Sequence, residues 1–232
     1  MIAALAFDLD NTLYDHAQFV RGAHADVAAV AAEAAGLDPE RFLARIHGDW
    51  RRLTSRANTI FADALRDFGA FSPELEARLV AAYRAHQPRL EPFPGVAAAL
   101  ERARAAGLRL GLLTDGQVAV QNRKIEALGL VGRFDALVVT GELGPGFAKP
   151  HPAGFELLAR RLGTFPACMV YIGDNPLVDF APARRLGMRT LRVRTAEYLR
   201  ETAGTEWIDH SFDDPCQAVA WALDNRQGIP SP

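Results

Sequence analysis

The hydrophobic and polar positions of the chain follow three successive patterns. Residues 2–7 form a short apolar run, which predicts a buried β-strand. From about residue 15 to residue 87, apolar residues recur at helical spacing in segments rich in alanine and arginine. From residue 96 onward, short apolar runs alternate with helical segments. That alternation is typical of a parallel sheet with helices on both faces, so the chain is predicted to adopt an α/β fold.

The predicted elements fall into a helical block and an alternating part. The helical block contains expected helices at residues 16–35, 39–53, 57–69 and 73–87. The alternating part contains expected strands at 109–113, 136–139, 168–172, 190–193 and 207–210, and expected helices at 96–106, 117–128, 152–162, 176–186 and 214–225. Asp38-Pro39 and Ser72-Pro73 each resemble an N-cap followed by a first-turn proline. Residues 228–232 are expected to be a frayed tail.

The long helical block follows the first strand, where a single crossover helix is the usual connection. A connection of this length in a compact α/β domain is usually functional. We therefore expect a Rossmann-like catalytic core over residues 1–14 and 92–232, and an inserted helical cap domain over residues 15–91. The expected hinges lie near Tyr14 and in the proline-rich residues 88–94.

Composition and charge limit the class of protein. The chain has 232 residues, of which 49% are hydrophobic, and a net charge of −2. These values fit a soluble globular protein and give no reason to expect nucleic-acid or membrane binding. There is no signal-peptide pattern, no membrane-spanning run and no zinc-type spacing of the two cysteines. We expect a cytoplasmic protein, monomeric or homodimeric, and attribute the strong preference for arginine over lysine to composition alone.

An acidic pair directly follows the first predicted strand. Asp8 and Asp10 are two residues apart, so their side chains point the same way if the chain stays extended. Carboxylates this close repel each other, and they persist when a cation lies between them or when one holds a proton. The pair therefore indicates a metal site or a nucleophile beside a general acid. An Asx turn at the strand end explains Asp-x-Asp alone about equally well.

Further polar residues follow the other predicted strands. Thr114 and Asp115 follow the second strand, Lys149 precedes a helix, and Asp174 follows the strand at 168–172, with Asp179 five residues later. Each has a simpler explanation as a helix cap, an exposed loop lysine, a turn residue or a first-turn carboxylate. Because ligands bind at the carboxyl ends of parallel strands, their combination favours one shared site.

Four motifs resemble, in the same order, those of the haloacid dehalogenase superfamily, and specifically its phosphatase branch. They are FDLDNTL at residues 7–13, LLTDG at 112–116, KPHP at 149–152 and IGDNPLVD at 172–179. The resemblance covers nearly the whole chain, because the helical block matches the family's cap. It implies a Mg²⁺-dependent phosphatase that hydrolyses a small soluble phosphomonoester, of the nucleotide or sugar phosphate class, through an aspartyl-phosphate.

The resemblance also implies a role for each member of the acidic pair. Asp8 would be the nucleophile that accepts the phosphoryl group. Asp10 would protonate the leaving oxygen and then activate the attacking water. An acid at Asp10 separates phosphatases from the dehalogenases of this family, since a halide leaves without a proton.

The remaining motif residues would bind phosphate and metal. Thr114 and Lys149 would hold the phosphoryl oxygens, together with the backbone N–H groups of Leu9, Asp10 and Asp115. The expected Mg²⁺ ligands are Asp8, the backbone carbonyl of Asp10, Asp174, and Asp179 through water or through its orientation of Lys149. Asp115 departs from the family pattern, in which asparagine is more usual, although its backbone N–H would still serve.

Substrate specificity and three rival functions stay open. The cap candidates for specificity are His16, Arg21, Trp50, Arg51, Arg52, Arg56 and Asn58. A phosphomutase of the β-phosphoglucomutase kind shares all four motifs. A phospho-aspartate receiver domain uses a similar set of residues but is about half this length and has no cap. A non-catalytic binding protein on the same fold is a third alternative, although every catalytic position is intact.

Overall fold

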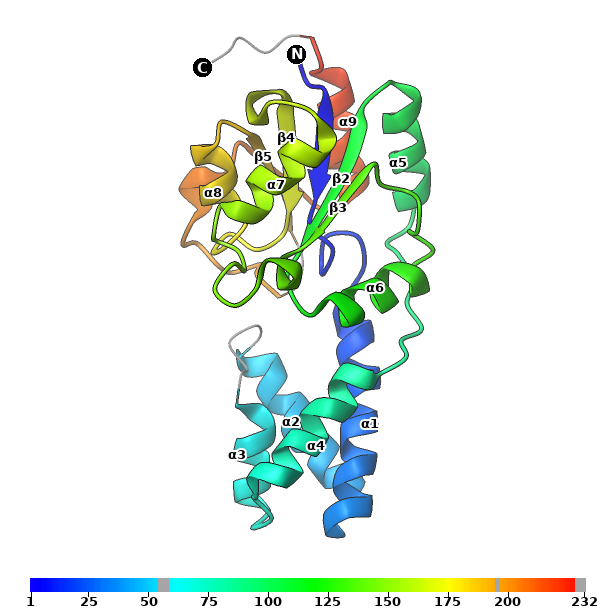
Figure 1. Ribbon diagram of the computed structural model, residues 1–232, viewed down its shortest axis with the longest axis vertical. Coiled ribbons are helices and arrows are strands. Elements are labelled where there is room, and N and C mark those ends of the chain that lie inside the picture. The colour runs from blue at the N-terminus through cyan, green and yellow to red at the C-terminus, as the bar shows by residue number, and fades with distance from the viewer. Residues whose placement is uncertain (54–58, 195–196, 228–232) are drawn as a thin grey trace. The chain divides into compact units, whose positions relative to one another are not determined.

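The chain divides into two compact units in the computed structural model (Figure 1), which describes residues 1–53, 59–194 and 197–227. The sheet unit comprises Met1–Asp15 and Glu91–Pro232, and the helical unit comprises His16–Leu90.

Some sequence predictions concern residues outside the described part of the chain. These are the specificity candidates Arg56 and Asn58, the first two residues of the helix expected at 57–69, and the tail at 228–232.

The sheet unit contains a six-stranded parallel sheet in the order β3-β2-β1-β4-β5-β6, which confirms the predicted α/β fold with a parallel sheet. The strands are β1 (Ala4–Phe7), β2 (Arg109–Thr114), β3 (Ala136–Val139), β4 (Met169–Gly173), β5 (Arg189–Val193) and β6 (His210–Phe212). The helices are α5 (Val96–Ala105), α6 (Val118–Ala127), α7 (Ala153–Leu162), α8 (Phe180–Arg185) and α9 (Pro215–Asp224).

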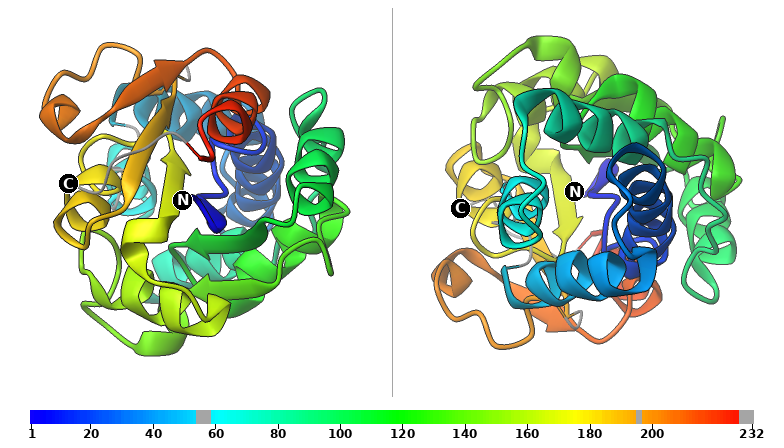
Figure 2. Two further views of the ribbon diagram at one scale, coloured as in Figure 1. Left: turned by 90° about the horizontal axis from the view of Figure 1, so that it is seen from above. Right: turned by 90° about the horizontal axis from the view of Figure 1, so that it is seen from below.

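Helices cover both faces of this sheet. Helix α7 packs on β2 and β3 and α8 packs on β4 and β5, while α9 packs on β4, β5 and β6 from the other side, next to α5 (Figure 2). The two central strands β1 and β4 are buried along their whole length. This double coverage explains why their sequences are almost continuously apolar.

The helical unit is a bundle of α1 (Ala17–Ala35), α2 (Pro39–Leu53), α3 (Ile60–Asp67) and α4 (Pro73–Ala85). Helix α1 packs against α2 and α4, and its apolar face meets Phe42, Ile46 and Leu79 in a common core. Both predicted caps are present, because Asp38 accepts the Arg41 N–H at 2.9 Å and Ser72 accepts the Leu75 N–H at 3.1 Å. In the described part of the chain, no helix is long and apolar enough to cross a membrane.

Two predicted elements of the sheet unit begin three or more residues later than expected. Helix α8 begins at Phe180, four residues later than expected, because Asn175 starts a turn in which its side chain accepts the Leu177 N–H at 3.0 Å. The last strand was expected at 207–210, but residues Thr205–Trp207 form a 3₁₀ turn and β6 begins only at His210.

The register of the central strands brings three strand ends to within two residues of one level. Phe7 pairs with Leu112 of β2 on one side and with Ile172 of β4 on the other. The residues that follow each strand therefore emerge at the same edge of the sheet, which is where the sequence places its acidic and hydroxyl groups.

Replacing Ser72 by alanine removes the acceptor for the Leu75 N–H. We expect Ser72→Ala to lower the free energy of unfolding by about 1 kcal/mol in urea denaturation followed by circular dichroism. Ser72→Asp keeps a capping oxygen and should retain nearly all of the stability. Equal losses in the two variants would show that capping is not the cause.

Candidate active site

A tight loop after β1 presents the acidic pair. Asn11 adopts the left-handed conformation with φ of 60°, which asparagine tolerates better than most residues. The turn is closed by the Leu13 N–H, which donates to the Leu9 carbonyl at 3.0 Å. Because the chain turns here, Asp8 and Asp10 do not share one environment, contrary to what an extended strand end predicts.

Asp8 lies in a buried ion-paired network centred on Lys149. The Lys149 Nζ lies 2.6 Å from Asp8 Oδ1 and 2.7 Å from Asp179 Oδ1. The Tyr171 hydroxyl accepts a hydrogen bond from Lys149 Nζ at 3.3 Å and donates to Asp179 Oδ1 at 3.1 Å. One ammonium group therefore holds two carboxylates that come from different strand ends.

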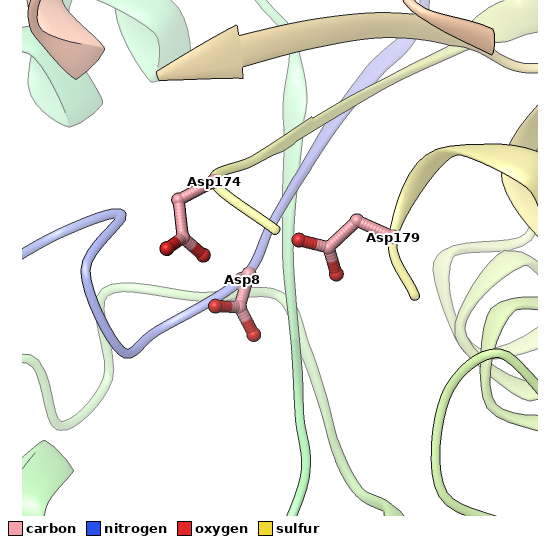
Figure 3. Close-up of side chains that lie close together, drawn as sticks. All are labelled: Asp8, Asp174 and Asp179. Carbon is pink, nitrogen blue, oxygen red and sulfur yellow. The ribbon is translucent and has the colours of Figure 1, made fainter. Parts of the chain in front are cut away.

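Three carboxylates meet at this point and form a candidate cation site. Asp8, Asp174 and Asp179 are all buried, and each offers an oxygen within 4.8 Å of the oxygens of the other two (Figure 3). A donor set made only of carboxylate oxygens suits a hard divalent cation such as Mg²⁺. The residues present therefore fit the metal that the motifs imply.

The pKa values in this cluster are shifted first by burial and then by the charges of its members. Burial raises the pKa of Asp8 from 3.8 to about 7, and Asp179 and Asp10 add to the rise while Lys149 opposes it. Burial is the main cause that raises the pKa of Asp174 well above its usual value, and the charges of Asp8 and Asp179 add to the rise. Burial alone would lower the pKa of Lys149, but Asp179 and Asp8 raise it well above its usual value. A bound divalent cation would favour the ionised carboxylates.

The glycine at the end of β4 leaves room for Asp179. A Cβ atom on Gly173 would lie 2.5 Å from Asp179 Oδ2. The same oxygen accepts the Asn175 N–H at 3.0 Å, while Oδ1 is held by Lys149, so both oxygens of the carboxylate are fixed. Asp179 precedes α8 directly but makes no side-chain cap to that helix, and its oxygens serve the cluster instead.

Thr114 is the last residue of β2 and Asp115 follows it; neither caps a helix, because the residue that precedes α6 is Gln117. Thr114 is buried at the strand end. The Asp115 side chain accepts the Thr140 hydroxyl at 2.8 Å and the Lys149 backbone N–H at 3.1 Å. Asp115 therefore fixes the loop that carries Lys149, a role that the sequence did not suggest for its side chain.

Asp10 has partners of its own. Its two carboxylate oxygens each lie 2.9 Å from Lys124 Nζ, and Tyr14 donates to Oδ1 at 2.5 Å. Gln121 Nε2 donates to Thr114 Oγ1 at 2.5 Å and to Asp10 Oδ2 at 3.3 Å. Tyr14 and two residues of α6 thus hold the Asp10 carboxylate, and none of these three belongs to the Lys149 network.

Sequence reasoning missed Lys124, Gln121 and Tyr171. One signal could have identified Lys124. Of the 26 Lys and Arg residues in the chain, two are lysines, Lys124 and Lys149, and the rest are arginines. The arginine preference that we attributed to composition alone therefore leaves two exceptions, and both are in the site.

The described specificity candidates lie in the helical unit. The Trp50 ring packs against His16 and His47, with ring centroids 6.4 Å and 5.4 Å apart, so it is half-buried among neighbours. Arg52 pairs with Asp49 at 3.1 Å, and Arg21 and Arg51 are exposed. Their part in substrate binding stays a prediction.

Comparison with known proteins gives one family and several relatives. Residues 2–187 match the family of haloacid dehalogenase-like hydrolases. A glyceraldehyde 3-phosphate phosphatase of Methanocaldococcus jannaschii is 29% identical over 92% of this chain and 93% of its own. The protein of the same name from Methanopyrus kandleri is 34% identical over 85% of this chain and 86% of its own. The crystal structure of a Thermotoga maritima protein described as a putative β-phosphoglucomutase has the same fold, with a TM-score of 0.73, 21% identity and coverage of 96% and 99%.

The raised pKa of Asp8 predicts a pH-dependent stability. The folded protein holds the Asp8 proton up to about pH 7, whereas the unfolded chain releases it near 3.8, so stability falls as pH rises through this window. In chelator, we expect the melting temperature to fall between about pH 4 and pH 7, and to fall less in Asp8→Asn. Mg²⁺ should raise it mainly at the higher pH. Parallel curves for the wild type, Asp8→Asn and the exposed control Asp224→Asn would contradict this assignment.

Gly173→Ala should displace Asp179 from the carboxylate cluster, because the new methyl group would overlap Asp179 Oδ2. We expect the variant to lose most of the rise in melting temperature that Mg²⁺ produces in the wild type. Gly48→Ala, in α2 with open space around its Cβ, is the matched control and should keep that rise. If Mg²⁺ raised the melting temperature of Gly173→Ala as much as that of the wild type, this would contradict a role of Asp179 in binding Mg²⁺.

Proposed function

Because the chain belongs to the haloacid dehalogenase-like hydrolases, we propose that it is a Mg²⁺-dependent phosphatase acting on a small soluble phosphomonoester. The observation that carries this proposal is the buried Asp8, which is ion-paired with Lys149 beside Asp174 and Asp179. A nucleophilic carboxylate, a fixed cation and a divalent-cation site are the parts that phosphoryl transfer needs.

In the first step, an Asp8 oxygen attacks phosphorus and the bond to the ester oxygen breaks. Asp10 gives a proton to that leaving oxygen, and Asp8 becomes an aspartyl-phosphate. Lys149 and Thr114, with the backbone N–H groups of Leu9, Asp10 and Asp115, stabilise the charge on the phosphoryl oxygens. Asp8, Asp174 and Asp179, with the Asp10 carbonyl, would hold Mg²⁺, and that ion would supply further positive charge for the phosphoryl group.

In the second step, water attacks phosphorus of the aspartyl-phosphate. Asp10 takes a proton from this water, the bond between phosphorus and the Asp8 oxygen breaks, and inorganic phosphate leaves. Asp8 returns to its carboxylate form, held by Lys149. The same Asp10 thus acts as acid and then as base, which fits its place apart from the Lys149 network.

The substrate is proposed from the relatives and from the helical unit. Two relatives that match most of the chain carry the name glyceraldehyde 3-phosphate phosphatase, which supports a small sugar phosphate of triose size. We assign the helical unit the part of a cap that selects the organic half of the substrate. The enzyme is proposed to be cytoplasmic, as a monomer or homodimer. Its two free cysteines fit a reducing compartment.

Phosphate release from a panel of phosphates tests the proposal. The panel contains glyceraldehyde 3-phosphate, hexose phosphates and nucleotides, each with Mg²⁺ or with chelator. We expect Mg²⁺-dependent release by the wild type and by Asp224→Asn, and a loss of about a thousandfold or more in Asp8→Asn.

Two results would contradict the proposal. Undiminished release by Asp8→Asn would remove Asp8 as the nucleophile. Conversion of a sugar phosphate into its isomer without free phosphate would replace the phosphatase by a phosphomutase.

A further inference from the structure

Both lysines of the chain are buried, and each pairs with one member of the acidic pair. The side chain of Lys149 is 4% exposed and pairs with Asp8, and that of Lys124 is 5% exposed and pairs with Asp10. The other Lys and Arg positions of the chain, out of 26 in all, are arginines. Lysine carries a compact point charge, whereas the guanidinium of arginine is a wide planar fork.

Lys124 and Gln121 both hold Asp10, and Gln121 links it to Thr114, the proposed phosphate-binding residue. Lys124 and Gln121 are one turn apart on α6 and therefore share a face of that helix. Lys124 holds both oxygens of Asp10 at 2.9 Å, while Gln121 bridges Asp10 Oδ2 and Thr114 Oγ1. The Gln121 amide uses Thr114 Oγ1 as an acceptor, so the Thr114 hydroxyl proton is directed elsewhere.

Stability alone is a poor reason for this pair. A buried ion pair costs desolvation that its attraction often fails to exceed, and apolar residues of similar volume frequently serve as well. Asp10 is also a quarter exposed in its side chain, so Lys124 holds a carboxylate that solvent or a ligand can reach. The ion pair therefore fixes the orientation of that carboxylate more than it stabilises the hydrophobic core.

We propose that Lys124 is a positioning residue, which aims the Asp10 carboxylate for proton transfer in both steps of the reaction. The inference rests on the proposed phosphatase function. Lys124 acts through Asp10 and makes no bond to the substrate. Gln121 sets the distance between Asp10 and the hydroxyl that holds the phosphoryl group.

The test separates phosphoryl transfer from hydrolysis of the phosphoenzyme. In p-nitrophenyl phosphate the leaving nitrophenolate needs no proton, so transfer to Asp8 does not depend on Asp10, whereas the attack of water does. In Lys124→Met we expect the first turnover to stay close to the wild-type rate, and steady-state kcat to fall about tenfold to a hundredfold. Intact-mass spectrometry should then show the phosphoenzyme accumulating. Asn122→Ala, exposed on the same helix, is the control and should match the wild type.

Two further measurements exclude a merely structural effect. Lys124→Arg keeps the cation and should recover part of the lost steady-state rate, and an Arg variant as slow as Lys124→Met would overturn a role for the charge. A crystal structure of Lys124→Met should show the Asp10 carboxylate displaced from Gln121. An unmoved carboxylate, or equal losses in the first turnover and in steady state, would overturn the proposal.

The same experiments keep the two hypotheses apart. If the wild type releases no phosphate but Asp10 is displaced in Lys124→Met, the phosphatase function has failed and the positioning by Lys124 stands. If the wild type is active and Lys124→Met is equally active, the phosphatase function stands and the positioning role has failed. Should Lys124→Met not fold, circular dichroism will show it, and the recovery in Lys124→Arg decides the case.

Discussion

The repulsion among buried carboxylates is the constraint on which the rest of this structure depends. Asp8, Asp174 and Asp179 converge at one sheet edge, and each is taken out of water. Lys149 compensates part of their charge, and the features around it keep it in place: Asp115 holds its backbone, Tyr171 its ammonium group, and Gly173 leaves space for Asp179. Burial, followed by repulsion among these carboxylates, raises the pKa of Asp8 and Asp174, and a bound cation would relieve both effects.

The parallel sheet makes this convergence possible without long loops. Neighbouring strands end at the same edge of the sheet, so residues from segments far apart in the chain meet without a long connection. Helix α6 adds a second set of partners from the side, through Gln121 and Lys124. The two aspartates of the first motif thus receive separate environments, which suits two different chemical tasks.

Much of this organisation was predictable from the sequence, and the exceptions have physical reasons. The central strands are apolar without a break because both faces are covered, so their positions were clear, as were the residues that follow them. The start of α8 was not, because a side-chain turn at Asn175 competes with helix formation. Lys124 and Gln121 carry no periodic signal, since polar residues on a predicted helix normally face solvent. The substrate is not readable from the helical unit because its arginines and Trp50 suit a surface or a core equally well.

The placement of both lysines has a consequence for the chemical reactivity of the protein. Acylating reagents and acetyltransferases require an exposed, uncharged amine, and the two ε-amino groups of this chain are buried ammonium ions. Its surface cations are arginines, which such reagents leave unmodified. The folded protein should therefore keep its side-chain charge under lysine acetylation. A protease that cleaves after lysine should find its sites only when the sheet edge itself comes apart.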